Sequence, residues 1–474
     1  MPYDQLAPST RPTSATFRDP AGSLEITPHA VIRTVKLAHT QATHDLLALP
    51  LAARLVQQQR LIASEILPNP DSNPNAPLRL RHPRIPFVSY PWEWPPALWL
   101  SAAELTLNLA SELVNDGWIL KDATPLNVLF QGTQPIFVDL LSIQRANLTQ
   151  PIWFAYGQFV RMFLLPMLTH AQLGWPLHAT LSHRDGYEPE DVYQALSLLA
   201  RLRQPALSAI TLPLLLSRKA KSTTASTPPR KPTDPALTTY VLRKTFARLL
   251  ADMRRVTPKH RPSTWSDYAE TAHHYSHEDH AGKQAFISAA LHAARPTHLL
   301  DVGCNTGVYS RLAAHSGAHV VAIDTDLQAV DRLATSLIVN PANILPLCVD
   351  LAHPTPATGW SNQEYPAFLT RCAGHFDTVL MLAVIHHLLL RAQIPLPHIA
   401  ALCSRITTRH LILEWVPPTD PKFQELLRGR EAIYTHITEA AFRKAFDPYF
   451  DILRETTLAN GRILFHFLRN PTTT

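Results

Sequence analysis

The 474-residue sequence predicts an α/β protein in two parts, with a C-terminal half built on a parallel sheet and an α+β half before it. From Leu237 onward, short apolar runs of strand type alternate with helical segments, as is typical of a parallel sheet with crossover helices. Residues 217–236 are rich in Ser, Thr, Pro and Lys, which favours a flexible linker. We therefore expect domains at residues 1–216 and 237–474.

The composition narrows the class of protein. Hydrophobic residues make up 46% of the chain and charged residues 17%, which indicates a globular protein with sizeable cores. The net charge of +6 is small for this length, and the basic residues form no long tract, so we expect no nucleic-acid partner. The longest apolar runs are too short to span a bilayer, and the first residues lack the apolar core of a signal peptide. A cytoplasmic protein without a membrane span is expected.

The sequence of the N-terminal half predicts the following elements in chain order. Two short strands flank the "TPH" turn within residues 23–35, and a helix runs from His44 to Leu67. A strand in "IPFVSYPWEW" leads into a proline-stiffened turn, and the next helix has Ser101 as its N-cap and Gly117 after its end. A loop with two flanking strands occupies residues 119–142, and residues 152–199 are mostly helical.

The sequence of the C-terminal half predicts seven strands. Five apolar runs separated by helices are the expected parallel strands: "HLLDVG" (298–303), "HVVAID" (319–324), "ILPLCVD" (344–350), "DTVLML" (377–382) and "HLILEWV" (410–416). The last two runs, "DILRETTL" and "ILFHFLR", are joined by "ANGR", which favours an antiparallel hairpin. Such a Rossmann-like sheet resembles that of class I S-adenosylmethionine-dependent methyltransferases.

A glycine-containing loop follows the first of these strands in "HLLDVGCNTGVYS". Gly303 and Gly307 allow backbone conformations that side chains resist, and Asn305 tolerates left-handed geometry better than most residues. The order D-x-G-x-N-x-G differs from the G-x-G-x-x-G of dinucleotide sites and resembles the first methyltransferase motif. S-adenosylmethionine carries an ammonium and a sulfonium in place of phosphates, so we expect Asp301 to face its amino-acid end.

Two more acids end the next two strands. Asp324 stands where an acid accepts the ribose hydroxyls of a nucleoside, and Asp350 stands where such enzymes contact the adenine amino group. Leu351 would then offer its backbone beside the ring. Each acid alone also fits a helix cap or a loop. Three acids at the carboxyl ends of successive parallel strands nevertheless converge on one crevice.

The acceptor side of the expected site follows the fourth and fifth strands. His386 and His387 come after "DTVLMLAVI", and Glu414 ends the fifth strand. A histidine there fits a general base for an acceptor that loses a proton, and it fits a structural or substrate-shaping residue equally. Glu414 fits a residue that holds substrate or orients a histidine, or a loop hydrogen-bonder.

The sequence favours no metal site. His273, His277 and His280 share one helical face in "YAETAHHYSHEDHAGK", yet no cysteine or carboxylate set completes a zinc site there. None of the four cysteines forms a C-x-x-C pair. We expect this segment to be a lid over the cofactor, with Tyr275 and Lys283 near the ligand.

The loop "ILKDATPLNVLF" indicates a second site in the N-terminal half. Asp122, Asn127 and, in "PIFVDLLS", Asp139 have the spacing of the catalytic loop and metal-binding aspartate of kinase-like phosphotransferases. They would position an acceptor hydroxyl and hold Mg²⁺ with ATP. No glycine-rich phosphate loop precedes them, and only Lys36, with Glu65 as its best partner, is available as the phosphate-pairing lysine. Three interpretations stay open: a degenerate binding domain, a working phosphotransferase, or a set of turn-forming residues.

Seven stretches spread over both halves occur in a characteristic order: "SYPWEW", "LKDATPLNVLF", "PIFVDLLS", "DVGCNTG", "HPTPATGW", "LAVIHHL" and "EWVPPTDPKFQELLRGR". This set resembles a bacterial family of predicted class I methyltransferases that includes the host-specific nodulation methyltransferase-like proteins. The resemblance runs from about residue 20 to the end and implies a methyltransferase activity. We expect a small-molecule or glycan acceptor, with the kinase-like half aiding substrate or nucleotide binding. The alternatives are a bifunctional phosphotransferase-methyltransferase, acting on a glycan or lipid-linked acceptor, and a non-enzymatic binding protein.

Overall fold

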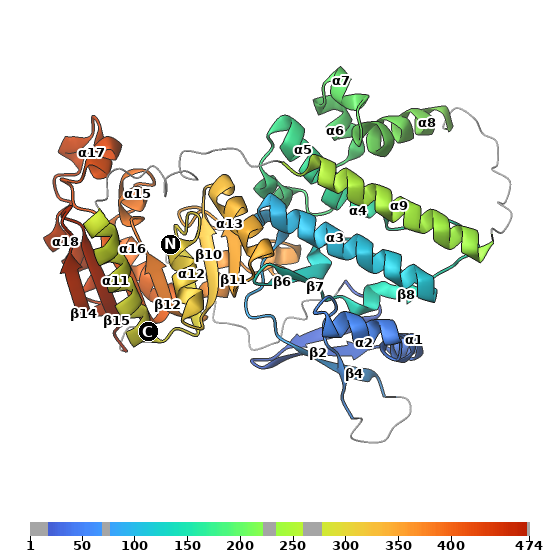
Figure 1. The fold of residues 1–474 in the computed structure, drawn as a ribbon, viewed down its shortest axis with the longest axis horizontal. Helices are drawn as coiled ribbons and strands as arrows, with labels where there is room; N and C mark the ends of the chain where they lie inside the picture. The colour runs from blue at the N-terminus through green and yellow to red at the C-terminus, as the bar shows by residue number, and fades with distance from the viewer. Residues whose placement is uncertain (1–17, 69–75, 221–233, 259–276, 472–474) are drawn as a thin grey trace.

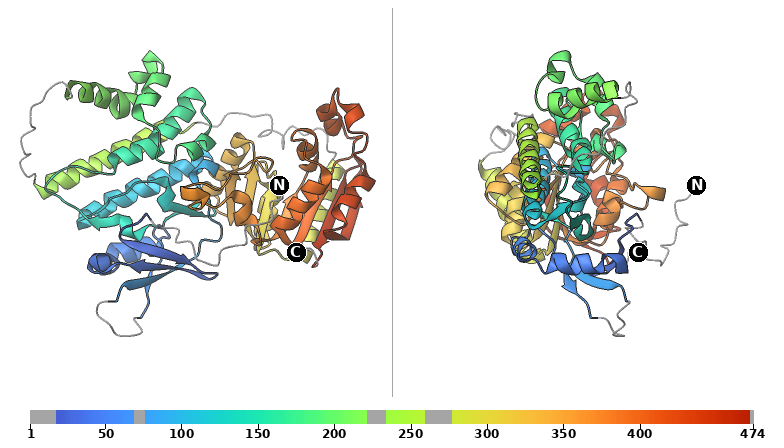
Figure 2. Two further views of the ribbon diagram at one scale, coloured as in Figure 1. Left: turned by 180° about the vertical axis from the view of Figure 1, so that it is seen from behind. Right: turned by 90° about the vertical axis from the view of Figure 1, so that its right-hand side faces the viewer.

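The computed structural model describes residues 18–68, 76–220, 234–258 and 277–471 (Figure 1). Its two halves lie side by side in Figure 1 and in the left view of Figure 2, with a small sheet at one end of the N-terminal half and short helices at the other. No helix in the described residues is long and apolar enough to cross a membrane.

The N-terminal half begins with a four-stranded antiparallel sheet in the order β1-β2-β4-β3. Its elements are β1 (Gly22–Ile26), β2 (Ala30–Val35), α1 (Leu37–Leu47), α2 (Pro50–Gln57), β3 (Glu65–Ile66) and β4 (Leu78–Pro83). The two strands around the "TPH" turn are confirmed. The single helix predicted from His44 to Leu67 is wrong, because Leu49 precedes a proline and takes an extended conformation that breaks the helix there.

A long helix and two short strand pairs follow. The elements are η1 (Pro91–Glu93), α3 (Pro96–Leu113), η2 (Val114–Asp116), β5 (Trp118–Leu120), η3 (Pro125–Asn127), β6 (Val128–Gln131), β7 (Gln134–Phe137), η4 (Leu140–Ser142) and β8 (Ile143–Arg145). Strand β5 pairs with β8, and β6 with β7, both antiparallel. Ser101 is not the N-cap of α3: the helix starts at Pro96, which suits a first turn, and Ser101 donates to Ala97 O inside it. Gly117 does end this region, in the left-handed conformation.

The rest of the N-terminal half is helical, as the sequence predicts. It contains α4 (Tyr156–Phe159), η5 (Val160–Leu164), α5 (Leu165–Leu173), η6 (Leu177–Ser182), α6 (Pro189–Ala195), α7 (Leu198–Arg201), η7 (Leu207–Thr211), α8 (Leu212–Ala220) and α9 (Pro235–Val256). Helix α9 lies along α3 (Figure 1) and buries Leu242, Phe246 and Leu249 in the same core. The predicted start of the second domain at residue 237 therefore differs from the structure, in which the packing of α9 belongs to the N-terminal half.

The C-terminal half is a seven-stranded sheet in the order β11-β10-β9-β12-β13-β15-β14. Its strands are β9 (His298–Val302), β10 (His319–Asp324), β11 (Ile344–Cys348), β12 (Phe376–Met381), β13 (Thr407–Trp415), β14 (Phe450–Thr457) and β15 (Ile463–Arg469). The first five are parallel, and β14 and β15 form the antiparallel hairpin, so the predicted mixed sheet is confirmed.

Helices cover both faces of this sheet (Figure 1). They are α11 (His277–Ala294), α12 (Val308–His315), α13 (Leu327–Val339), η8 (Trp360–Asn362), α14 (Phe368–Cys372), α15 (Ile385–Leu390), α16 (Leu396–Ile406), α17 (Pro421–Leu427), η9 (Glu431–Ile433) and α18 (Glu439–Phe446). Because each parallel strand is followed by a helix or loop at its carboxyl end, the expected site residues collect along one edge.

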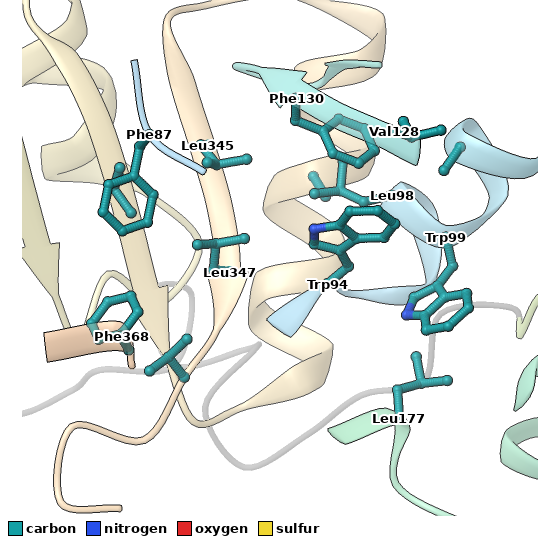
Figure 3. Packing of buried hydrophobic residues seen from close by; sticks show 14 of the residues in the cluster. Phe87, Trp94, Leu98, Trp99, Val128, Phe130, Leu177, Leu345, Leu347 and Phe368 are labelled. Carbon is teal, nitrogen blue, oxygen red and sulfur yellow. The ribbon is translucent and has the colours of Figure 1, made fainter. Parts of the chain in front are cut away.

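The two halves share one continuous hydrophobic core. Figure 3 shows Phe87 beside Leu345, Leu347 and Phe368 of the C-terminal half, while Trp94 packs with the residues around α3. A sheet strand and a connector far apart in the sequence thus bury each other's apolar surface, which is the main favourable term in such packing.

Polar contacts reinforce this shared core. Glu93 is fully buried and accepts two hydrogen bonds from the guanidinium of Arg371, and Thr355 Oγ1 donates to it at 2.6 Å. Arg371 also donates to Val88 O at 2.6 Å. On α13, Asp331 Oδ1 accepts from the Ala97 amide at 2.8 Å, so the C-terminal half supplies a carboxylate to the N-terminus of α3.

Candidate active site

The glycine loop joins β9 to α12 at the carboxyl edge of the sheet. Gly303, Asn305 and Gly307 take φ values of +74°, +50° and +83°, so all three occupy the left-handed region. The loop is tied to the neighbouring strand because the amides of Gly303 and Cys304 both donate to Ile323 O, at 2.8 and 3.0 Å. Asn305 thus takes a left-handed conformation that an asparagine side chain tolerates better than most.

The protein itself leaves no room for side chains at the two glycines. A Cβ on Gly303 would lie 2.5 Å from Val384 Cγ2, and one on Gly307 would lie 2.5 Å from Leu333 Cδ1. Both positions are therefore restricted twice, by backbone conformation and by packing. The backbone reason can be predicted from the sequence. The packing partners, Val384 directly before α15 and Leu333 on α13, are visible only in the structure.

Asp301 is buried at the end of β9, directly before the loop. Ser310 Oγ of α12 donates to Asp301 Oδ2 at 2.5 Å. Burial raises the pKa of this carboxyl to about 6; the Ser310 hydrogen bond opposes the shift, and the nearby charge of Asp324 adds to it. The two acids at the ends of β9 and β10 thus lie close enough to interact electrostatically.

Asp324 braces the glycine loop from the neighbouring strand. Its Oδ2 accepts from the Asn305 amide at 2.8 Å, and its Oδ1 accepts from the Asp326 amide at 2.9 Å. Burial raises the pKa of Asp324, while these two backbone hydrogen bonds lower it. Each carboxylate oxygen has a second lone pair, so the group retains capacity to accept from hydroxyl donors.

Asp350 lies after β11, in a turn that its own side chain stabilises. Oδ1 accepts from the Ala352 amide at 2.8 Å, and Oδ2 lies 2.9 Å from His353 Nδ1. The side chain is 43% exposed, in contrast to the buried Asp301. Leu351 beside it is buried in the shared core.

Glu414 is fully buried at the end of β13 and forms the centre of an ionic network. Lys283 Nζ of α11 donates to its Oε2 at 2.5 Å, and Arg462 Nη1 donates to its Oε1 at 3.3 Å. Arg462 Nε in turn donates to Asp420 Oδ2 at 2.7 Å. Arg462 and Asp420 were not identified from the sequence. Arg462 stands in the predicted "ANGR" turn, where an arginine is ordinarily a surface residue.

The paired histidines begin α15, beyond β12. His386 is buried, and burial lowers its pKa to about 3, with the charges of His387 and Arg462 adding to the shift. Its Nδ1 has no hydrogen-bond partner among the residues that the structure describes. Burial also lowers the pKa of His387, whose ring centroid lies 4.3 Å from that of His386. Both imidazoles are therefore neutral near pH 7.

The second predicted site lies around η3 and the β6–β7 hairpin. Burial raises the pKa of Asp122, Lys121 opposes the shift, and the charge of Asp139 adds to it, which places the two carboxylates near each other. Asn127 Nδ2 lies 3.5 Å from Ser142 Oγ, which donates to Asp139 O at 2.9 Å. Ser142 thus links Asn127 to Asp139, and Asp122 lies within electrostatic range of Asp139.

An arginine on β2 also faces this cluster. Arg33 on β2 is buried; its Nη1 donates to Asp139 Oδ1 at 3.2 Å and lies 3.9 Å from Asp19 Oδ2. The predicted pair of Lys36 and Glu65 is wrong: Lys36 is exposed at the start of α1, and Glu65 bonds to Arg81. Arg33 stands in the middle of a predicted strand, and an arginine there has no motif that marks it as a cation of this site.

The predicted histidine-rich lid lies largely outside the described residues. His273 and Tyr275 are not described, and His277 is described only as the first residue of α11. Lys283, expected near the ligand, lies beside Glu414 and 5.3 Å from the ring of Tyr309. Among the described residues, no group of three His, Cys, Asp or Glu side chains is arranged to hold a metal ion.

Comparison with known proteins supports a methyltransferase. Residues 272–404, which include β9 to β12 and the glycine loop, match the family model of a methyltransferase domain. Nodulation protein NoeA of Rhizobium meliloti (strain 1021) is 28% identical over 476 residues, covering 98% of this chain and 97% of its own length.

Parts of the chain also match solved structures. The N-methyltransferase NodS from Bradyrhizobium japonicum WM9 is 14% identical, with a TM-score of 0.30, over 41% of this chain and 98% of its own. The bifunctional kinase-methyltransferase WbdD is 16% identical, with a TM-score of 0.29, over 43% of this chain and 41% of its own.

The chain is a methyltransferase that uses S-adenosylmethionine, and its catalytic domain is the class I α/β sheet of the C-terminal half. The alternative of a non-enzymatic binding protein is therefore set aside.

Proposed function

We propose that the chain methylates a small-molecule or glycan acceptor held between the carboxyl edge of the C-terminal sheet and the N-terminal half. The observation that supports this proposal best is the collection of carboxylates at one edge around the glycine loop: Asp301, Asp324, Asp350 and Glu414. The bound cofactor supplies an electrophilic methyl group on a sulfonium, and the chain's own residues position it and the acceptor.

Each carboxylate has a separate role in holding the cofactor. Asp301 faces the ammonium of the amino-acid end, because a buried carboxyl with a raised pKa is stabilised in its ionised form by a nearby cation. Asp324 accepts from the two ribose hydroxyls while it braces Asn305. Asp350 contacts the adenine amino group, with Leu351 beside the ring. Gly303 and Gly307 shape the loop between them.

On the acceptor side, His386 positions substrate rather than removing a proton. A group with a pKa of about 3 is a weak base near neutral pH, and effective general bases have pKa values closer to the working pH. The unpartnered Nδ1 of a neutral, buried imidazole is suited to a hydrogen bond with the acceptor. His387 packs against it, and Glu414 fixes the network behind it.

Calorimetry with S-adenosylmethionine tests the cofactor assignment. Asp324→Asn keeps one acceptor oxygen for the Asn305 amide but loses the charge, and we expect at least about tenfold weaker binding, which equals about 1.4 kcal/mol. Asp451→Asn, an exposed change on β14, is the control and should bind like the parent. An unchanged affinity in Asp324→Asn would remove Asp324 from the site.

We propose further that the N-terminal half is a kinase-like domain that binds substrate or nucleotide. The sheet, the α3 helix and the two short strand pairs follow one another as in that fold, and Arg33 faces Asp139 from β2. No phosphate-binding glycine loop stands in β1 or its turn, which favours ligand binding over phosphotransfer.

The bifunctional alternative is favoured by one observation, the approach of Asp122, Asn127 and Asp139 to one another. Turnover of Mg-ATP with a panel of sugar and lipid-linked acceptors tests it. Turnover that disappears in Asp139→Ala supports phosphotransfer, and absence of turnover across the panel counts against it.

A further inference from the structure

Exposed leucines are concentrated on two short helices at one end of the N-terminal half. Among the described residues nine leucines are exposed, and six of them stand within residues 198–216, with exposed fractions between 46% and 74%. These six, called the leucine surface below, are Leu198, Leu199, Leu202, Leu212, Leu215 and Leu216. A single exposed leucine is ordinary, but such a concentration is typical of a surface that contacts a partner or a membrane.

Helix α8 presents an apolar side to solvent. Leu212, Leu215 and Leu216 follow the i, i+3, i+4 pattern, so they share one side of this helix. Leu214, between them in sequence, is partly buried and packs against the core. The helix therefore has apolar residues on its inner side and on its outer side, whereas an ordinary surface helix is polar on the outer side.

The two helices that carry the leucine surface are held together. Thr211 Oγ1, directly before α8, donates to the carbonyl of Arg201 at the end of α7 at 2.7 Å, next to Leu202. Arg201 Nε donates to Leu196 O at 3.0 Å, and its guanidinium lies over the ring of Tyr193 at 4.3 Å. In Figures 1 and 2 the green helices α7 and α8 lie at the outer end of the N-terminal half, away from its β1–β4 sheet.

The sequence around these leucines is basic and contains no acid. Residues 192–233 include seven Lys or Arg residues and no Asp or Glu, whereas the net charge of the entire chain is only +6. Arg203 is exposed beside the leucines, and Lys219 stands in the last turn of α8. The leucine surface is therefore complementary to a partner that is both apolar and negatively charged. The seven cations are Arg201, Arg203, Arg218, Lys219, Lys221, Arg230 and Lys231.

Three other occupants fit the leucine surface less well. A second copy of the chain would place like charges against one another, which disfavours association. Residues 221–233 follow α8 but contain no apolar residue other than alanine and proline, so they are unsuited to covering six leucines. Protein interfaces are anchored mainly by Trp, Tyr, Met and Arg, whereas this surface is entirely aliphatic. Leucines flanked by Lys and Arg are typical of helices that lie on a membrane surface.

We propose that the leucine surface docks onto a lipid bilayer that contains anionic lipids. The leucines enter the boundary between the head groups and the acyl chains, and the neighbouring cations face the lipid phosphates. The chain is thereby held on the membrane by one end of its N-terminal half. This contact requires neither S-adenosylmethionine nor the methyl acceptor, so the inference does not depend on the proposed function.

Co-flotation of the full chain with lipid vesicles tests the proposal. Anionic vesicles contain phosphatidylethanolamine and phosphatidylglycerol in a ratio of about 3:1, and neutral vesicles contain phosphatidylcholine alone. We expect the chain to float with the anionic vesicles and to bind the neutral ones at least about tenfold more weakly. Binding should weaken as the salt concentration rises from about 0.1 M to about 0.5 M, because the contact is partly electrostatic.

The apolar part of the contact is tested by Leu199→Gln/Leu216→Gln. This double variant should bind anionic vesicles at least about tenfold more weakly, because two apolar side chains no longer enter the lipid. Leu37→Gln/Leu453→Gln is the matched control, since both residues are exposed leucines outside the leucine surface. The control should bind like the parent. Thermal melting of each variant separates lost binding from lost folding.

The electrostatic part is tested by Arg203→Gln/Lys219→Gln. Each cation near an anionic surface contributes about fivefold to binding, so this variant should bind at least about tenfold more weakly. Arg79→Gln/Arg409→Gln is the matched control, because it removes the same net charge from exposed residues elsewhere on the chain. This control should bind nearly like the parent.

Four outcomes would overturn the inference. The chain does not float with anionic vesicles, it floats equally well with neutral ones, or Leu199→Gln/Leu216→Gln floats like the parent. In the fourth, light scattering shows a dimer that this variant abolishes, which would assign the leucine surface to a second copy of the chain. Polyglutamate that binds as tightly as the anionic vesicles would likewise assign it to an acidic protein. Flotation of a chain that fails to bind S-adenosylmethionine would leave this inference intact and refute the proposed cofactor site instead.

Discussion

Lys283 Nζ on α11 lies 2.5 Å from Glu414 Oε2 at the end of β13, and both side chains are buried. Arg462 approaches the other oxygen of Glu414 and continues the network to Asp420. A helix that precedes the sheet is thereby tied to the fifth strand of the sheet.

Removing Glu414 should be strongly destabilising. Glu414→Ala leaves Lys283 without this partner in a buried position, and such a change typically costs about 3–5 kcal/mol. Urea denaturation measures the loss. The double variant Lys283→Met/Glu414→Gln removes the unpaired charge and should recover part of the stability, whereas purely additive losses would show that the two groups do not interact.

Binding of S-adenosylmethionine should release a proton near pH 6. The pKa of Asp301 is about 6, so its carboxyl is largely protonated below that pH, and a bound ammonium favours the ionised form. Affinity should therefore rise as the pH increases through 6. Calorimetry in two buffers of different ionisation enthalpy counts the protons. Asp301→Asn should bind more weakly, release none and show no rise; a parent that releases none would contradict the role of Asp301.

Gly303→Ala should impair both folding and cofactor binding. The left-handed conformation costs an alanine about 1–2 kcal/mol, and the added Cβ would also lie 2.5 Å from Val384 Cγ2. Gly317→Ala is the control, because that residue also has positive φ but its Cβ would have nothing within 4 Å. The control should lose stability alone. Equal losses of affinity in both variants would show that crowding at Gly303 is unimportant.

Glu93→Ala should weaken the contact between the halves. Its carboxylate, fully buried, holds the Arg371 guanidinium and the Thr355 hydroxyl, so its loss leaves a buried cation unpaired, at a cost of about 3–5 kcal/mol. Scanning calorimetry should show a lower melting temperature. Glu364→Ala, at a more peripheral contact with Arg18, is the comparison and should lose less. If Glu364→Ala lowered the melting temperature more than Glu93→Ala, the peripheral contact would be the more important one between the halves.

His386→Asn should lower kcat less than His386→Leu does, because the amide retains a polar group close to Nδ1. The imidazole is neutral across pH 5–9, so neither variant should move the limbs of the pH–rate profile. Methyl transfer assays from pH 5 to 9 provide the check once an acceptor is known. Disappearance of a limb in His386→Leu would identify the histidine as a general base after all.

The C-terminal sheet could be predicted because its signals are local. Each strand is an apolar run bounded by helices, and the positive φ at Asn305 agrees with the tolerance of asparagine for left-handed geometry. The network around Glu414 could not be predicted, since Lys283 and Arg462 stand 131 and 48 residues from it. Arg33 could not be predicted for a different reason: kinase-like sites typically use a lysine to pair the phosphates, whereas β2 places an arginine beside Asp139.

Helix boundaries also depended on distant residues. Ser101 has the chemistry of an N-cap, but α3 extends back to Pro96, and Asp331 of α13 accepts from the amide of the next residue, Ala97. Helix α9 follows the linker in sequence, yet its apolar face packs against α3. Local sequence patterns cannot reveal either contact, because Asp331 is distant in sequence from α3 and α3 is distant in sequence from α9.

The position of α9 determines how the chain can be divided. The composition suggests a division at residues 217–236. Such a division would leave α9 on the C-terminal fragment, and the side of α3 that α9 covers would become exposed. Separate production of the two fragments would also expose Phe87 to water on one piece and Phe368 on the other. Both pieces would be prone to aggregate, and only the uncut polypeptide is suited to purification and assay.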